Sequence, residues 1–229
     1  MTAQLRALLA NAPGVIGAAR VLRLDQLVAP AAAPHARWGL EPMRGRLVEL
    51  SAHGAAATLT AAADLVLEAQ RAAEPVAWIE LAGSGFFPPD LAASGVDLAA
   101  LVVVRVGEPS AATRAAARLL ASGAFGLVIL DFAGAAALDV PMAQQGRLVT
   151  LAQNHDAAVV CLTDKPADVP SLSSLVSLRA EATRADHGDG DGDAAQGNAA
   201  RGDAVRIEIR KDKQRGAGGV HVLALGVES

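Results

Sequence analysis

The chain has 229 residues, and 52% of them are hydrophobic, which is enough to bury one sizeable core and suits a single domain. The formal net charge of −4 comes from one segment, residues 185–203, whose five aspartates and one arginine give −4, so the rest is balanced. This composition excludes a broad basic surface, and with only 3% aromatic residues it argues against autonomous nucleic-acid binding. No apolar run reaches the ~18 residues of a membrane-spanning helix, and the first ten residues lack a signal-peptide layout. We therefore expect a soluble, cytoplasmic protein.

The first part of the chain, residues 1–40, predicts a segment that packs on the core or on a partner, with a strand candidate at Val21–Leu24. Residues 41–229 predict the core domain, in which strands and helices alternate. Strands are expected over Arg46–Leu50, Val76–Leu81, Leu101–Val106, Gly126–Asp131 and Ala157–Thr163. Helices are expected over Leu59–Gln70, Pro88–Gly95, Ser110–Ser122 and Val140–Asn154. The near-continuous apolar run at Leu101–Val106 indicates a strand buried on both faces, and Ser110 is the expected N-cap of its helix.

The C-terminal part of the chain has a different pattern. Leu175–Glu181 predicts a short strand, and the Gly/Asp-rich residues 185–203 predict a disordered acidic loop. Val205–Arg210 alternates apolar and polar residues, and a Gly-rich turn separates it from an apolar strand at Val220–Leu225. The predicted fold class is therefore α/β, with a largely parallel central sheet flanked by helices and a C-terminal antiparallel hairpin. The single cysteine, Cys161, predicts an inert core position.

Gly45–Gln70 has the strand, loop and helix outline of a phosphate-binding loop without its chemistry. In such a loop, glycines let backbone N–H groups surround the phosphates, a lysine meets the β- and γ-phosphates, and a hydroxyl holds magnesium. Here alanine replaces both end glycines, Thr58 takes the lysine position and Leu59 takes the hydroxyl position. The residues of this vestigial loop are Ala52, Gly54, Ala57, Thr58 and Leu59. We expect no tight binding of magnesium-nucleotide; an ordinary strand–loop–helix stays open as the alternative.

Several segments in order resemble the core of the RecA recombinase family, over roughly Met43–Val227. Besides the loop, Ser94-Gly95-Val96-Asp97 followed by Leu101 resembles the family's L-G-V-D-x-x-x-L stretch. Asp131 falls where the Walker B aspartate ends its strand, and Val176–Arg179 and Arg206–Lys213 resemble the C-terminal strands. The resemblance implies a RecA-like core.

The departures from that family indicate lost activity. The position of its water-activating carboxylate falls near Ala82, and Asp164 stands about where the family has a glutamine that senses the γ-phosphate. Phe132–Asp139 and Asp164–Ser174 take the places of its two DNA-binding loops, but both are short, and Lys165 is their only basic residue. We expect a pseudo-ATPase with no catalytic residue, no cofactor, no metal and weak or no direct DNA binding.

A short RecA-like core without the phosphate-loop lysine resembles the ImuA group of bacterial proteins, as does the opening Val21–Leu27 before the G-R-L-V-E-L strand. That resemblance implies an accessory subunit of a damage-induced, mutagenic translesion-synthesis complex. Its implied partners are an inactive Y-family polymerase homologue and an error-prone C-family polymerase, and RecA is a further candidate. The alternatives are a SulA-like inhibitor of the tubulin-like division protein and a divergent RecA-like ATPase.

Two groups of polar residues can be interpreted either as structural or as functional. Asp131 is expected to be a structural carboxylate that caps loop N–H groups, rather than a metal ligand, and Thr58 and Thr60 are expected to cap their helix. The compact basic cluster consists of Arg210, Lys211, Lys213 and Arg215. Lys211 and Lys213 match two lysines that in the RecA family reach across a subunit interface, so this cluster is the candidate contact with DNA phosphates or an acidic partner. A solvated basic hairpin is the alternative.

Overall fold

The computed structural model describes residues 38–52, 57–135, 138–166, 168–184 and 204–224. The predictions for most of the N-terminal segment and for the acidic loop at 185–203 lie outside these residues. No helix in the described ranges is long and apolar enough to span a membrane.

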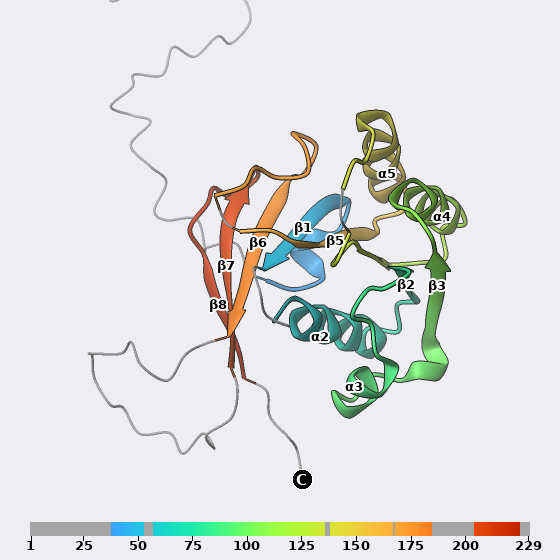
Figure 1. The fold of residues 1–229 in the computed structure, drawn as a ribbon, viewed down its shortest axis with the longest axis horizontal. Helices are drawn as coiled ribbons and strands as arrows, with labels where there is room; N and C mark the ends of the chain where they lie inside the picture. The colour runs from blue at the N-terminus through green and yellow to red at the C-terminus, as the bar shows by residue number, and fades with distance from the viewer. Residues whose placement is uncertain (1–37, 53–56, 136–137, 167, 185–203, 225–229) are drawn as a thin grey trace, which may run out of the picture. The chain divides into compact units, whose positions relative to one another are not determined.

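One eight-stranded sheet organises the described residues, in the order β3-β2-β4-β5-β1-β6-β7-β8 (Figure 1). Its strands are β1 (Arg46–Ala52), β2 (Val76–Leu81), β3 (Leu101–Val106), β4 (Leu127–Asp131), β5 (Ala158–Asp164), β6 (Leu178–Arg184), β7 (Ala204–Asp212) and β8 (Val220–Ala224). Strands β1 to β6 pair in parallel, whereas β7 and β8 are added antiparallel. The predicted α/β class, the largely parallel sheet and the C-terminal hairpin are confirmed.

Helices cover both faces of the parallel part (Figure 1). They are α2 (Ala57–Arg71), α3 (Pro88–Ala93), α4 (Pro109–Ala121) and α5 (Met142–Asn154), with short 3-10 turns at Glu41–Met43 and Leu98–Ala100. One apolar core lies between the sheet and α2 with α3, and the other lies between the sheet and α4 with α5. Strands β4 and β5 are buried from both sides, which explains their uninterrupted apolar sequences. Cys161 of β5 is a free, buried cysteine, as predicted.

A buried ion pair joins the parallel and antiparallel parts of the sheet. Arg46 of β1 contacts Asp212 at the end of β7, with Nη2 and Oδ1 2.6 Å apart, and both side chains are buried. The same guanidinium donates to the Ser177 hydroxyl and carbonyl and to the Pro42 carbonyl. An arginine in a fully buried strand is therefore satisfied inside the protein.

Three local predictions were wrong. β3 is an edge strand rather than a strand buried on both faces, and Val102 and Val103 are 43% and 39% exposed. β6 begins at Leu178, three residues later than predicted, because Ser177 is taken up in contacts with Leu47 and Arg46. Helix α4 begins at Pro109, which puts Glu108 at the N-cap and Ser110 inside the first turn.

Candidate functional site

The phosphate-loop frame is present as β1 followed by α2. β1 ends at Ala52 and α2 begins at Ala57, and the loop position Gly54 lies outside the described residues. Thr58 is buried as the second residue of α2, so neither it nor Thr60 is the N-cap, and that prediction was wrong. Leu59 packs against the apolar core beside Gly85. The lysine and hydroxyl positions of the motif thus hold one buried threonine and one packed leucine.

One pocket adjoins helix α2, and a second lies at the ends of neighbouring strands. The first has a volume of about 230 Å³. It is lined by Leu59, Thr60, Ala63, Gly85, Phe86, Phe87, Asp90, Leu91, Ser94 and Arg184. The second, of about 280 Å³, lies where β2, β3 and β4 end, which is the edge where α/β sheets commonly bind ligands. It is lined only by small and apolar residues: Leu81, Ala82, Gly107, Pro109, Ala133, Gly134 and Ala135. Neither pocket is lined by a lysine.

Asp131 ends β4 beside the second pocket and is buried. Its Oδ1 accepts a hydrogen bond from the Ala133 N–H at 3.1 Å, which is the loop-capping role that its position predicts. Its Oδ2 has no hydrogen-bond partner among the described residues. Burial raises the pKa of Asp131 to about 6, against the lowering effect of the Ala133 amide, and the nearby Glu80 raises it further.

Glu80 of β2 stands opposite Asp131 of β4, so two carboxyl groups lie at the ends of neighbouring strands. The Arg105 guanidinium of β3 forms an ion pair with Glu80, and the Ser84 hydroxyl donates to Glu80 Oε2 at 3.3 Å. Glu80 is therefore held by a cation and a hydroxyl, a contact that was not predicted. Its signal in the sequence was one charged residue in each of two apolar runs, which the register of β2 with β3 places side by side.

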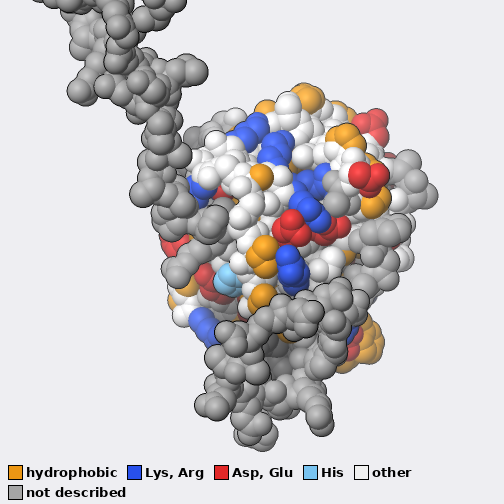
Figure 2. Space-filling view, turned by 90° about the vertical axis from the view of Figure 1, so that its left-hand side faces the viewer, with side chains coloured by type: hydrophobic (Ala, Val, Ile, Leu, Met, Phe, Trp, Pro, Cys, Tyr) orange, Lys and Arg blue, Asp and Glu red, His pale blue; other side chains and the backbone are white. Residues whose placement is uncertain are grey.

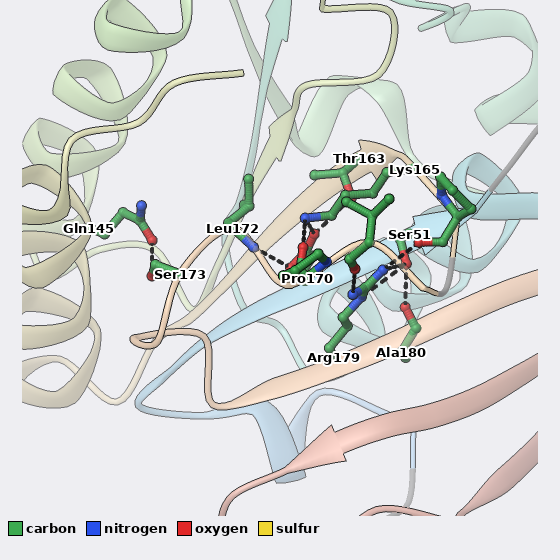
Figure 3. A network of polar contacts seen from close by, with 12 residues as sticks. Ser51, Gln145, Thr163, Lys165, Pro170, Leu172, Ser173, Arg179 and Ala180 are labelled. Carbon is green, nitrogen blue, oxygen red and sulfur yellow. Dashed lines mark hydrogen bonds and ion pairs between the residues drawn. The ribbon is translucent and has the colours of Figure 1, made fainter. Parts of the chain in front are cut away.

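A buried polar network fixes the loop that follows β5 (Figure 3). Glu49 of β1 is fully buried; its Oε1 lies 2.6 Å from Lys165 Nζ and 3.1 Å from the Thr163 hydroxyl, and its Oε2 accepts from the Leu172 N–H at 2.9 Å. Lys165 Nζ also donates to the Pro170 carbonyl at 2.7 Å. The only basic residue of this predicted loop thus points inward to a carboxylate and does not lie free on the surface.

Arg179 of β6 holds the same loop from its other side (Figure 3). It is buried, and its guanidinium donates to the Ser51 hydroxyl and to the carbonyls of Pro166 and Val169. The Ser173 hydroxyl adds a contact with Gln145 of α5 at 2.5 Å. We call residues 165–166 and 168–175 the fastened loop, because β1, β6 and α5 all hold it. The signals in the sequence were Glu49 and Arg179, two charged residues within buried strands.

The basic cluster lies along β7 and the turn after it, on the side of the molecule shown in Figure 2. Arg210 is ion-paired with Glu181 at 2.6 Å and with Glu208 at 2.9 Å. Lys213 donates to the Ser174 carbonyl. Burial lowers the pKa of Lys211, and the Lys213 charge adds to that effect, whereas Arg215 is exposed. Two of the four cations therefore have partners within the chain, and a role for the cluster in DNA or partner contact stays a prediction.

Within the described ranges, no group of three or more His, Cys, Asp or Glu side chains is arranged to hold a metal ion. This statement covers Asp131 and Glu80, which have no third ligand of these types.

Comparison with known proteins gives a fold and no family. No family model matches the sequence, and no curated protein does. Among solved structures, the fold is similar to that of a KaiC-like protein from the hyperthermophilic archaeon Pyrococcus horikoshii OT3, with a TM-score of 0.55. The match covers 80% of this chain and 87% of that chain at 14% identity. The chain has a RecA-like core. At 14% identity, the similarity to the KaiC-like protein concerns the fold alone.

Proposed function

We propose that this protein is a non-catalytic accessory subunit of a damage-induced, error-prone translesion DNA synthesis complex. In this proposal the RecA-like core is a scaffold, and its function lies in surfaces that bind other proteins. The observation that carries the proposal is the packing of Thr58 and Leu59 in the first turn of α2. The two positions that would supply an ammonium group and a magnesium-binding hydroxyl instead supply a buried hydroxyl and an apolar side chain.

The surroundings of Asp131 support the loss of hydrolysis. The position expected for the water-activating carboxylate is Ala82, whose methyl group cannot accept a proton. The carboxylate opposite Asp131, Glu80, is ion-paired with Arg105. A general base needs a free carboxylate within reach of the attacking water, and Glu80 is already engaged.

The fastened loop supports a static scaffold. A loop that senses a γ-phosphate must change conformation when the nucleotide is bound or hydrolysed. Here Glu49 and Arg179, both buried, hold the corresponding loop by hydrogen bonds and an ion pair. Releasing the loop would take Lys165 and the Leu172 N–H from Glu49 and two backbone carbonyls from Arg179, and leaving buried charges with so few partners costs several kcal/mol. These contacts therefore oppose such a conformational change.

The proposed partners are the inactive Y-family polymerase homologue and the error-prone C-family polymerase, and RecA is a third. This assignment rests on the resemblance of the opening segment and core to the ImuA group, together with a RecA-like core that offers surfaces and no nucleotide chemistry.

Co-purification tests this proposal. The tagged full-length chain is expressed with each polymerase and with RecA, and the proposal expects a stable complex with the Y-family homologue. A Lys211→Glu, Lys213→Glu variant tests whether the basic hairpin takes part, with Arg118→Glu on α4 as a control for charge change elsewhere. Failure to recover any of the three partners would overturn the scaffold proposal. Growth filamentation on overproduction would instead favour the SulA-like alternative, and magnesium-dependent ATP binding lost in Asp131→Ala would favour the ATPase.

A further inference from the structure

The outer edge of β8 is the feature that the proposed function leaves unexplained. β8 is the last strand of the sheet, and no strand in the described part of the chain pairs with its outer side. Its sequence is Val-His-Val-Leu-Ala, without a charged residue or a proline. Edge strands are normally protected by such residues, because their free N–H and C=O groups attract further strands.

The hydrogen bonds of the hairpin show which groups of β8 are free to pair. The Ile209 N–H donates to the Gly219 carbonyl at 2.7 Å, and the Ile209 carbonyl accepts from the Gly218 N–H at 3.0 Å, so both Ile209 groups face β8. Hydrogen-bonded and non-hydrogen-bonded pairs alternate along an antiparallel ladder. His221 and Leu223, opposite Ile207 and Val205, are therefore the bonded residues. The backbone groups of Val220, Val222 and Ala224 point away from β7.

The side chains of the same two valines are also uncovered. Val220 and Val222 are 52% and 60% exposed and lie beside Glu208 and Arg206, on the face opposite the buried Val205, Ile207 and Ile209. Figure 2 shows this side of the molecule, where hydrophobic side chains lie among charged ones. Because the two valines expose both their side chains and their backbone groups, this edge can pair with another extended strand that carries apolar side chains.

We propose that β8 pairs antiparallel with β8 of a second copy, across a two-fold axis at Val222. In this register Val222 faces Val222, Val220 faces Ala224, and His221 faces Leu223, so no like charges stand opposite each other. Arg206 lies one strand further from the axis on each copy, so the Cα atoms of the two arginines are about 14 Å apart at the usual strand spacing. Arg206 is exposed, and its aliphatic stem is long enough to cover the valine pair.

A second copy fits this edge better than it fits the other edge of the sheet. β3 also exposes valines, but it carries Arg105, whose guanidinium is held by Glu80. A charge in an edge strand opposes pairing with another strand. Since β8 contributes only five residues, the contact is smaller than the ~1,200 Å² of a standard interface, and the dimer is weak and depends on concentration.

The test uses the full-length chain and its mass in solution over roughly 3 to 300 µM, a range chosen for a weak dimer. The wild type is expected to rise from the mass of one chain towards that of two. Val222→Lys places two ammonium groups opposite each other and next to two Arg206 side chains, so at least a tenfold weaker dimer is expected. Val103→Lys on β3 is the matched control and should dimerise like the wild type. Circular dichroism checks that each variant is folded.

A mixing experiment tests the register. Val222→Lys is mixed with a tagged Val222→Glu chain, and a mixed dimer is expected because Lys and Glu then face each other across the axis. Val222→Glu by itself is expected to weaken the dimer less than Val222→Lys does, because Arg206 of the same chain offsets the glutamate charge. A wild type that stays monomeric would overturn the proposal and leave the edge to a strand from another polypeptide. Dimerisation unaffected by Val222→Lys, or the absence of a mixed dimer, would overturn it as well. Because the purified chain is tested alone, failure here leaves the scaffold proposal intact.

Discussion

Lys165→Met removes the ion pair that holds the fastened loop and leaves the Glu49 carboxylate in place. Methionine keeps a long, apolar side chain at this position, so the change is mainly the loss of the ammonium group. Glu49 is fully buried and retains only the Thr163 hydroxyl and the Leu172 N–H as donors among the described residues. The variant therefore leaves a buried carboxylate without its cation.

The loss of unfolding free energy in Lys165→Met can be estimated from how deeply Glu49 and Lys165 are buried. Removing one partner of a buried ion pair costs about 3–5 kcal/mol, because the other charge stays desolvated. The Lys165 side chain is partly accessible, so water reaches this end of the pair and the lower value applies. We expect the free energy of unfolding to fall by about 3 kcal/mol, which corresponds to roughly 6–12 °C in Tm for a domain of this size.

Urea denaturation of the wild type and variants measures this difference. Lys213→Met is the matched control, because Lys213 also donates to the fastened loop, at Ser174, but from an exposed position. Its expected cost is below about 0.5 kcal/mol. The double variant Glu49→Gln, Lys165→Met removes both charges and should recover about 1–2 kcal/mol of the loss. Hydrogen exchange of the Leu172 amide should speed up in Lys165→Met and stay slow in the control.

The reasoning would be refuted by a Lys165→Met variant that unfolds within about 0.5 kcal/mol of the wild type. It would also be refuted if the double variant were no more stable than the single one, since the penalty would then not come from the unpaired Glu49 charge.

Two further predictions concern buried charges elsewhere. Arg46→Met should lower the free energy of unfolding by about 3–5 kcal/mol in urea, because it leaves Asp212 buried without its cation; a loss below about 1 kcal/mol would contradict this. Burial raises the pKa of Asp131 from 3.8 to about 6, so the folded state binds its proton more tightly than the unfolded state. Its contribution to stability is therefore present below about pH 4 and is lost as pH rises through 6. Asp131→Asn should remove this part of the pH dependence, roughly 1–3 kcal/mol between pH 4 and 7, and unchanged pH dependence of unfolding would count against it.

Most of the sheet was predictable from the sequence because its strands are short apolar runs. The segments between them repeat their apolar residues with the period of a helix. β2, β4, β5 and the β7–β8 hairpin all occur where the pattern placed them, within about two residues. β3 was misjudged because an apolar run is also compatible with an edge position. Hydrophobicity gives the tendency to form a strand and does not give the order of strands in the sheet.

The polar contacts were much less predictable than the strands. Glu49 and Lys165 are 116 positions apart in the chain, and only the parallel pairing of β1 with β5 brings them together. The sequence showed Lys165 only as the one basic residue of two short loops, whereas the structure pairs it with a buried carboxylate. The basic cluster likewise appeared as four neighbouring cations, but Arg210 is paired with Glu181 on the neighbouring strand β6. Such contacts depend on register, which local patterns do not contain.

We propose that this RecA-like core neither binds nor hydrolyses nucleotide, and calorimetric titration of the full-length chain with magnesium-ATP tests this most directly. We predict no heat of binding above that of dilution, and the same result for Asp131→Ala. Binding at micromolar affinity that requires magnesium and is lost in Asp131→Ala would contradict the claim.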